Sequence, residues 1–514
     1  MPKRVNTPER LEAARAVIND LFQSHVEWFL TIAGGDSQAL NQGELEIFVA
    51  HGRLLLGCWT EEGTRSWKIF SWEWTGEKLT FEASRRLGAE RPIIELVPRA
   101  SATAIALTVK AARQARCAAL AQLVCANQTG AKVERVSLSP GARRGQPGRY
   151  ARILLRLKHE RVAVTGLVSA GRPSDADAFL AASLLWFKRT SERARAPYIQ
   201  QLRLIVETDL VRPVLQRVAL LRQSLRDAIT IYEVDQQLTE LALVDVPTRE
   251  ELWNRRLRRF PPMLPAELSH AAARIKSIVP NAIDIVSARQ GETLRYFGLP
   301  FARVRRLMGS ERVWFGLEGS SRRLLDEKSE REFQNLLIDL QEHRAADAAD
   351  RRHALYRNAA EAWLESSLRR DITKLDPGLI IAPLHAQFRT APGGTISVRP
   401  IDLLALRHDG RLAVIELKVA EDREHVLQGV DYWQRVEAHR RRGHISKAKL
   451  FGNRKIKNEP PLIYLVAPTL RVHPAFNTLA RSIAPDIEIY RFDINEDWRA
   501  GVRVMRRLRL GGRD

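Results

Sequence analysis

Residues 399–419 have the sequence RPIDLLALRHDGRLAVIELKV, and this stretch decides the fold of the C-terminal part of the chain. Residues 398–406 and 412–419 are rich in Val, Ile and Leu and are bounded by turn residues, which predicts two strands. Residues 408–410 (His-Asp-Gly) suit a three-residue hairpin loop, with the glycine in the left-handed conformation of a bulged turn. The stretch therefore predicts an antiparallel hairpin.

The length of the hairpin loop decides which side chains share a face. With three loop residues, Asp402 lies opposite Glu416, about 5 Å away at Cβ. Lys418 falls on the face of Glu416, because side chains alternate along a strand. A two-residue Asp-Gly turn would move Asp402 to the other face. The site therefore needs the odd loop or a bulge near Pro400.

An Asp, a Glu and a Lys on one face can hold a divalent cation and activate a water beside a phosphodiester. The alternative is a salt-bridged hairpin whose Glu and Lys face solvent, because 28% of the chain is charged. The flanking segments favour the first interpretation. Residues 356–370 predict a helix that carries Glu361, and residues 423–442 predict another, with Gln428 and Tyr432 one turn apart on one face.

This order of helix Glu, strand Asp, Glu-x-Lys, then helix Gln and Tyr resembles the RecB-like branch of the PD-(D/E)xK nuclease superfamily. It is similar to the C-terminal domain of the mismatch-directed endonucleases. The resemblance covers residues 350–495 and implies a restriction-endonuclease-like mixed sheet flanked by helices. One departure is Ile401, which stands before Asp402 where the superfamily pattern has Pro; Pro400 is one step earlier.

The resemblance assigns catalytic roles to Asp402, Glu416, Lys418 and Glu361, and auxiliary roles to Gln428 and Tyr432. Asp402, Glu416 and the backbone carbonyl of Leu417 would bind Mg²⁺ or Mn²⁺, which would polarise the phosphate and lower the pKa of an attacking water. Lys418 would orient that water or stabilise charge on the phosphoryl oxygens. Glu361 would ligate a second ion or position the water. We expect Glu416 and Lys418 at a solvated edge of the sheet, where replacing them costs little stability.

The chain carries 82 Lys and Arg against 60 Asp and Glu, a net charge of +22. Such a field attracts polyanions, although a solvated basic surface is the alternative interpretation. Beside a nuclease-like site we expect a nucleic-acid partner, with DNA favoured and RNA left open. The arginines expected to contact it are Arg399, Arg435, Arg143 and Arg144. The last two stand in a Gly-rich basic segment, residues 141–148, which lacks the Gly-Lys-Ser/Thr ending of a phosphate-binding loop.

The remaining C-terminal pattern predicts alternating strands and helices. Residues 461–467 form a continuous apolar run, typical of a central strand covered on both faces. Residues 474–483 predict a helix and residues 487–493 another strand. Residues 499–513 fit either a final strand or a short helix. This alternation indicates a layered α/β architecture.

At 514 residues the chain predicts an α/β multidomain protein with two to four domains. Residues 1–240 form a mixed α+β region of one or two units, in which a β meander precedes helices. Residues 241–345 form a small α/β unit or linker, with a boundary at the proline cluster of residues 260–265. Residues 350–514 form the nuclease-like domain.

Within the first 340 or so residues the patterns are weaker. A helix is predicted over residues 8–32, a strand over 104–109 and a helix over 111–126. The meander strands are predicted at residues 45–50, 53–59, 67–74 and 78–83. We interpret its tryptophans as sheet packing and not as a base-stacking surface. Amphipathic helices are predicted over residues 202–226, and helix throughout residues 328–370.

The chain has three cysteines, none at a metal-ligand spacing with histidine. Cys117 and Cys125 are too far apart on one predicted helix for a disulfide. The N-terminus lacks the apolar segment of a signal peptide, and no apolar stretch is long enough to span a membrane. We therefore expect a cytoplasmic protein with no membrane partner. Its oligomeric state is open, and a dimer is compatible with the sequence.

The expected function is that of a Mg²⁺-dependent endo- or exonuclease. Two alternatives stay open. One is a non-catalytic nucleic-acid-binding protein with a nuclease-like fold. The other is an immunity effector nuclease gated by a small ligand bound to the N-terminal part, for which no ligand motif is present.

Overall fold

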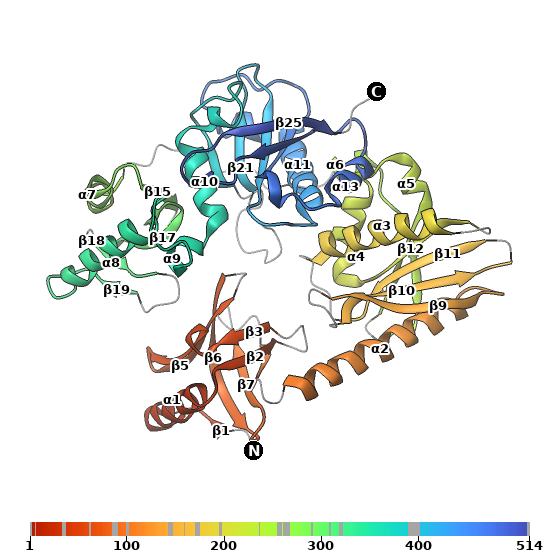
Figure 1. The fold of residues 1–514 in the computed structure, drawn as a ribbon, viewed down its shortest axis with the longest axis horizontal. Coiled ribbons are helices and arrows are strands. Elements are labelled where there is room, and N and C mark those ends of the chain that lie inside the picture. Colours follow the sequence, from red (N-terminus) through yellow and green to blue (C-terminus); the bar gives the residue numbers. More distant parts are fainter. Residues whose placement is uncertain are drawn as a thin grey trace.

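A computed structural model gives the structure of the protein. The residues it describes are 3–5, 7–32, 38–60, 63–84, 91–98, 102–141, 147–158, 160–169, 175–194, 198–235, 237–253, 257, 260, 268–288, 291–307, 310–317, 322–388 and 401–510. They form a mixed α/β structure with four sheets (Figure 1). Within these ranges, no helix is long and apolar enough to cross a membrane.

The N-terminal sheet is antiparallel, in the order β3-β2-β8-β7-β6-β5-β4, with β1 paired to β6. Its elements are β1 (Lys3–Arg4), α1 (Pro8–Gln23), β2 (Glu27–Ile32), β3 (Gln38–Asn41), β4 (Leu45–Ala50), β5 (Arg53–Thr60), β6 (Gly63–Trp74), β7 (Leu79–Ser84) and β8 (Ile93–Pro98). The predicted meander is confirmed as β4 to β7. Trp67 and Trp72 are buried in its core, as the sheet-packing interpretation predicts.

The predicted helix over residues 8–32 is wrong beyond Gln23. Residues 27–32 form β2, in which Trp28 and Leu30 are buried and alternate with more exposed side chains. A period of two is the signature of a strand with one buried face, and it overrides the helical pattern of the preceding residues.

The second sheet has the order β14-β13-β12-β11-β10-β9, and β11, β12 and β13 are parallel. Its elements are α2 (Ala102–Ala126), β9 (Lys132–Pro140), β10 (Pro147–Arg156), β11 (Arg161–Leu167), α3 (Ala176–Arg193), β12 (Ile199–Glu207), α4 (Thr208–Val218), α5 (Gln223–Ala228), β13 (Ile229–Val234), β14 (Leu241–Val244) and α6 (Arg249–Trp253).

Two predictions in this unit are wrong. Residues 104–109 continue helix α2 and are not a strand, because alanines within them extend the Ala-rich helical sequence. Residues 202–207 belong to strand β12, which was predicted as helix. Leu202 and Leu204 are fully buried in this central parallel strand. A strand covered on both faces has a continuous apolar run without alternation, so periodicity does not distinguish it from a helix.

The third sheet is antiparallel, in the order β15-β16-β17-β18-β19. Its strands and neighbouring helices are α7 (His270–Ile278), β15 (Ile283–Ala288), β16 (Gly291–Tyr296), β17 (Leu299–Leu307), β18 (Ser310–Phe315), β19 (Arg323–Leu324), α8 (Glu330–His343), α9 (Ala354–Arg357) and α10 (Ala360–Arg370). Residues 261–265 of the proline cluster lie outside the described residues.

The segment predicted as helical throughout residues 328–370 is interrupted between α8 and α10. Arg344 is fully buried, and its guanidinium donates to the carbonyls of Leu355 and Asn358 at 2.7 Å and of Ala359 at 3.3 Å. Ala359 has a left-handed backbone with a φ of 49°. The buried guanidinium thus satisfies carbonyls that a continuous helix would bond internally, and the chain turns there.

The C-terminal sheet is mixed, in the order β20-β21-β22-β23-β24-β25. Its elements are β20 (His385–Phe388), β21 (Ile401–Leu406), β22 (Leu412–Leu417), α11 (His425–Arg441), α12 (His444–Lys447), β23 (Leu462–Pro468), α13 (Phe476–Ser482), β24 (Ile489–Ile494) and β25 (Val504–Leu510). Strands β22, β23 and β24 are parallel, and the outer pairs are antiparallel. The open choice for residues 499–513 is resolved as a strand over residues 504–510.

The predicted hairpin register is confirmed. Leu404 pairs with Val414, and the amide of Arg407 donates to the carbonyl of Arg411 at 2.9 Å, which leaves three residues in the loop. Gly410 has a φ of 84°, the left-handed conformation expected at this position. One step beyond the paired residues, this register sets Asp402 opposite Glu416.

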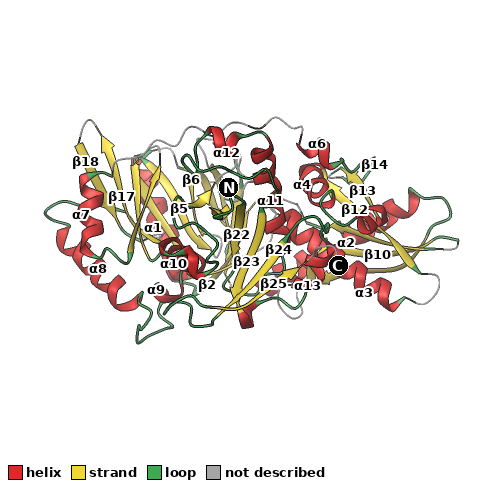
Figure 2. Ribbon diagram, turned by 90° about the horizontal axis from the view of Figure 1, so that it is seen from above, coloured by secondary structure: helices red, strands yellow, loops and turns green. Residues whose placement is uncertain are grey.

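Helices cover both faces of the C-terminal sheet (Figure 2). Helix α10 packs on the face that carries Leu403 and Ile415, and α11 packs on the face that carries Leu404 and Val414. Because side chains alternate, Asp402 and Glu416 belong to the α11 face.

Helices α11 and α13 also pack against α3 and α4 of the second unit in one continuous hydrophobic core. Inside this contact the guanidinium of Arg217 bonds Asp177 of α3 and lies 3.5 Å from Asp431 of α11. Arg217 is 8% exposed, so the ion pairs are shielded from water. The second and C-terminal units are therefore joined by apolar packing around a buried charge network.

Replacing Gly410 with Ala tests the loop that sets the register. A Cβ at Gly410 would lie 2.8 Å from the carbonyl oxygen of Lys455, and the left-handed backbone costs a non-glycine residue about 1–2 kcal/mol more. Gly452 is the matched control, because its φ of 63° is also left-handed but its Cβ would meet nothing within 4 Å. Urea unfolding should show a larger decrease in the free energy of unfolding for Gly410→Ala than for Gly452→Ala. Equal losses would contradict the close packing of this loop.

Candidate active site

Asp402 and Glu416 come from facing strands, and their carboxyl groups lie close enough to perturb each other's pKa. Asp402 Oδ2 accepts a hydrogen bond from the amide of Leu417 at 2.9 Å. This bond joins the two strands one step beyond their backbone ladder and holds the Asp402 carboxylate beside β22. Glu416 is 2% exposed, and its Oε2 has no hydrogen-bond donor among the described residues.

Lys418 lies among carboxylates where β22 ends. Its Nζ is 3.2 Å from Glu416 Oε1, 3.5 Å from Asp422 Oδ2 and 3.9 Å from Glu361 Oε2. Glu361 belongs to the first turn of α10. Lys418 therefore contacts acids from three places: the hairpin, the loop that follows it and the helix that precedes it. With Asp402 included, the site has four acids and one base, and it carries a surplus of negative charge.

Burial shifts the pKa values of these groups. Burial raises the pKa of Asp402, against the opposing effect of the Leu417 amide. Burial and then the charge of Asp402 raise the pKa of Glu416 well above its usual value of 4.5. Burial alone would lower the pKa of Lys418, but Glu416, Glu361 and Asp422 outweigh it and raise that pKa. The lysine therefore stays protonated while Glu416 retains its proton to an unusually high pH.

Gln428 and Tyr432 approach the same face from α11, where the four-residue spacing places them one turn apart. Gln428 is 3% exposed, and its Nε2 donates to Glu424 Oε2 at 3.4 Å. Its Oε1 has no donor among the described residues. Tyr432 is 4% exposed, and burial followed by the negative charge of Glu416 raises its pKa. Tyr432 thus borders the acidic cluster, and Gln428 lies one turn before it on the same helix, where its side chain contacts Glu424.

Two residues of the site were missed by sequence reasoning. Asp422 stands four residues after Lys418 in an acidic segment, a spacing that would have been the only signal. His425 Nε2 lies 3.2 Å from the carbonyl oxygen of Glu416, and burial together with the charge of Lys418 lowers its pKa to about 4. The imidazole is therefore neutral near pH 7 and can donate that hydrogen bond, which fixes the end of β22 against α11.

The expectation of a solvated edge is wrong for Glu416 and Lys418. Their side chains are 2% and 13% exposed, because α11 covers this end of the hairpin and Glu361 and Asp422 flank the lysine. Replacing either residue therefore changes a network that is shielded from water, where the effect on stability is larger than at an exposed position.

The donor set fits a hard divalent cation in part. Asp402 and Glu416 supply carboxylate oxygens, and the donor-free Oε2 of Glu416 is a buried acceptor that a cation would satisfy. Among the described residues, no group of three His, Cys, Asp or Glu side chains is arranged to hold a metal ion. The remaining ligands would therefore have to be the Leu417 carbonyl, water and substrate oxygens, which is typical of Mg²⁺.

The arginines expected to contact nucleic acid are mostly outside the described residues, namely Arg399, Arg143 and Arg144. Arg435 is described. Its guanidinium pairs with Asp431 at 2.5 Å and lies 4.6 Å from the ring centre of Tyr432. Its charge is thus engaged within α11, and a phosphate contact there stays a prediction.

Comparison of the chain with protein-family models, with curated proteins and with solved structures finds no match. The candidate site therefore rests on the geometry of its own residues.

Replacing Glu416 with Gln should stabilise the metal-free protein at neutral pH. Because the folded-state pKa of Glu416 is raised, folding retains a proton that the unfolded chain releases, and stability falls as pH rises above 4.5 towards the folded pKa. The amide of the Glu416→Gln variant cannot ionise, so we expect a Tm higher by roughly 2–4 °C, the shift that 1 kcal/mol produces in a domain of 150–250 residues. Mg²⁺ should raise the Tm of the wild type and leave that of Glu416→Gln unchanged.

Glu437 provides the matched control for this measurement. It is also fully buried, but it pairs with Arg440 and Arg441, each at 2.6 Å. Glu437→Gln should therefore lower the Tm with and without Mg²⁺. A Tm that falls equally in both variants would show that Glu416 is stabilised as an ordinary ion-pair partner of Lys418.

Proposed function

We propose that the protein is a metal-dependent nuclease that hydrolyses phosphodiester bonds, and that its C-terminal unit has a restriction-endonuclease-like fold. The observation that carries the proposal is the pair of carboxylates on facing strands, Asp402 and Glu416, with protonated Lys418 3.2 Å from Glu416. A structural salt bridge needs only one acid for each base. The excess of buried acids over bases costs folding energy, and a functional cation would offset that cost.

The charge of each residue at the site indicates its role. Asp402, Glu416 and the Leu417 carbonyl would hold Mg²⁺ or Mn²⁺, which when bound supplies charge stabilisation at the phosphate and an acidified water. Lys418 is protonated, so it acts as a donor that orients the water or stabilises phosphoryl charge, and not as the general base. Glu361 is 46% exposed, which leaves its carboxylate accessible to an incoming water.

Nucleic acid, DNA in the first instance, is the partner that the overall charge supports. The site is acidic, whereas the chain as a whole has a net charge of +22. A polyanionic substrate would therefore be attracted by the surrounding surface, and a divalent cation would screen it from the acids at the site. We expect most of the affinity to come from dispersed phosphate contacts, which makes binding weaker as salt rises.

Replacing Lys418 with Ala separates catalysis from binding. We expect cleavage to fall by at least about 10²-fold, the loss that removing one transition-state donor typically causes. Binding should persist, because phosphate contacts elsewhere provide the affinity. Cleavage of single-stranded, duplex, branched and mismatched DNA and of RNA should be followed with Mg²⁺, Mn²⁺ or EDTA. Binding should be measured in EDTA by fluorescence anisotropy.

Lys457→Ala is the control, because Lys457 lies in the same unit, pairs with Glu459 and has a side chain that is 47% exposed. This variant should cleave like the wild type. Equal cleavage by wild type and Lys418→Ala would point to another site or to a contaminating enzyme. Binding without cleavage of any substrate, with any of the metals, would favour a non-catalytic nucleic-acid-binding protein instead.

A further inference from the structure

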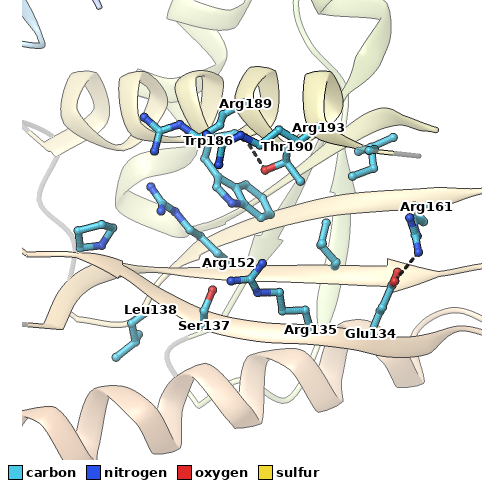
Figure 3. A pocket seen from close by; sticks show the side chains of 14 residues that line it. Glu134, Arg135, Ser137, Leu138, Arg152, Arg161, Trp186, Arg189, Thr190 and Arg193 are labelled. Carbon is cyan, nitrogen blue, oxygen red and sulfur yellow. Dashed lines mark hydrogen bonds and ion pairs between the residues drawn. The ribbon is translucent and has the colours of Figure 1, made fainter. Parts of the chain in front are cut away.

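A second candidate site lies in the second unit, where edge strand β9 and strand β10 face the C-terminal half of helix α3 (Figure 3). Its cavity has a volume of about 440 Å³. Small-molecule sites typically occupy about 300–1,000 Å³, so this cavity is large enough for a small organic ligand. It belongs to elements that carry none of the candidate nuclease residues.

Positive charge dominates the lining of this cavity. It holds five arginines and one acid, and that acid, Glu134, is paired with Arg161 at 2.5 Å. The other four are Arg135 of β9, Arg152 of β10, and Arg189 and Arg193 of α3. Within the part of the chain that the structure describes, no carboxylate lies within ion-pair distance of these four. Their charge is available to a ligand.

The arginines approach the cavity from two sides. Figure 3 shows Arg135 and Arg152 rising from the sheet, while Arg189 and Arg193 lie on the helix above it. Burial, then the charges of Arg189 and of Arg423 from the loop before α11, lower the pKa of Arg152 to about 10. The guanidinium groups repel one another because they are close together and positively charged. A bound anion would reduce that repulsion.

Trp186 of α3 lies between the two groups of arginines (Figure 3). The guanidinium of Arg152 is 5.9 Å from the centre of its ring. An indole ring can stack on a planar ring of a ligand. An arginine guanidinium can donate two parallel hydrogen bonds to the oxygens of a phosphate. The cavity thus combines groups that recognise phosphate with a group that recognises a flat ring.

We propose that this cavity binds a phosphorylated small molecule of nucleotide size, with its phosphates on Arg152 and Arg189 and its base on Trp186. A nucleic-acid strand is the rival occupant. The small volume and the arrangement of arginines on two opposing sides favour a compact ligand over a polymer that runs along the surface. The proposal stands independently of the C-terminal site.

Isothermal titration calorimetry of the full chain in EDTA tests the proposal, with ATP and inorganic triphosphate as probes. We expect both to bind the wild type with a Kd below about 1 mM. Arg189→Glu should lower the affinity for both probes at least about tenfold, the change expected when a charged hydrogen bond is replaced by a repulsion. Arg189 is exposed, so this variant is expected to fold, which circular dichroism will verify. Trp186→Leu should lower the affinity for ATP and leave the affinity for triphosphate unchanged.

Arg212→Glu is the matched control, because Arg212 is also exposed, lies on neighbouring helix α4 and does not line the cavity. Its affinity for both probes should stay within about twofold of the wild type, since a distant surface charge is screened by salt. Equal weakening by Arg189→Glu and Arg212→Glu would overturn the site, because the general positive field would then explain binding. Failure of both probes to bind, with a single-stranded oligonucleotide binding in a way that depends on Arg189, would assign the cavity to nucleic acid instead.

Discussion

The candidate site depends on one constraint, the odd number of residues in the hairpin loop between β21 and β22. Three loop residues place Asp402 opposite Glu416 on the face covered by α11. A shift of one residue would send one of these acids to the opposite face, where α10 packs on Leu403 and Ile415. The left-handed conformation of Gly410 thus helps to determine which charges face each other five residues further along the strands, about 16 Å away at a rise of about 3.3 Å per residue.

This register has an energetic consequence, because it brings buried acids together without an equal number of bases. Lys418 neutralises part of the charge, and Glu416 keeps a donor-free oxygen and a raised pKa. The fold holds this arrangement from both sides. Trp363 and Leu364 of α10 pack under the hairpin, and α11 is anchored to the second unit through Arg217 and a shared apolar core. Rigid packing around an unfavourable cluster is expected where binding of a cation supplies the compensating energy.

The features predictable from sequence were those specified locally. The hairpin, its register and the order of the surrounding helices followed from alternation, loop length and helical spacing. Strand β12 was missed because a strand buried on both faces lacks alternation. The break before α10 was missed because its donor, Arg344, lies 11 to 15 residues before the carbonyls it bonds, beyond the reach of helical spacing. The arginine cavity was missed for a similar reason, since packing between β9, β10 and α3 brings its side chains together.

Diffraction from crystals soaked with Mn²⁺ tests the central claim, that Asp402 and Glu416 share one metal ion. The anomalous signal locates Mn²⁺ without assumptions about the substrate or about activity. The account predicts a single strong peak bounded by oxygens of both carboxylates and the Leu417 carbonyl, at about 2.0–2.6 Å. Mn²⁺ bound elsewhere with none at this position, or carboxylates more than about 8 Å apart in the crystal, would contradict it, because one ion cannot span that separation.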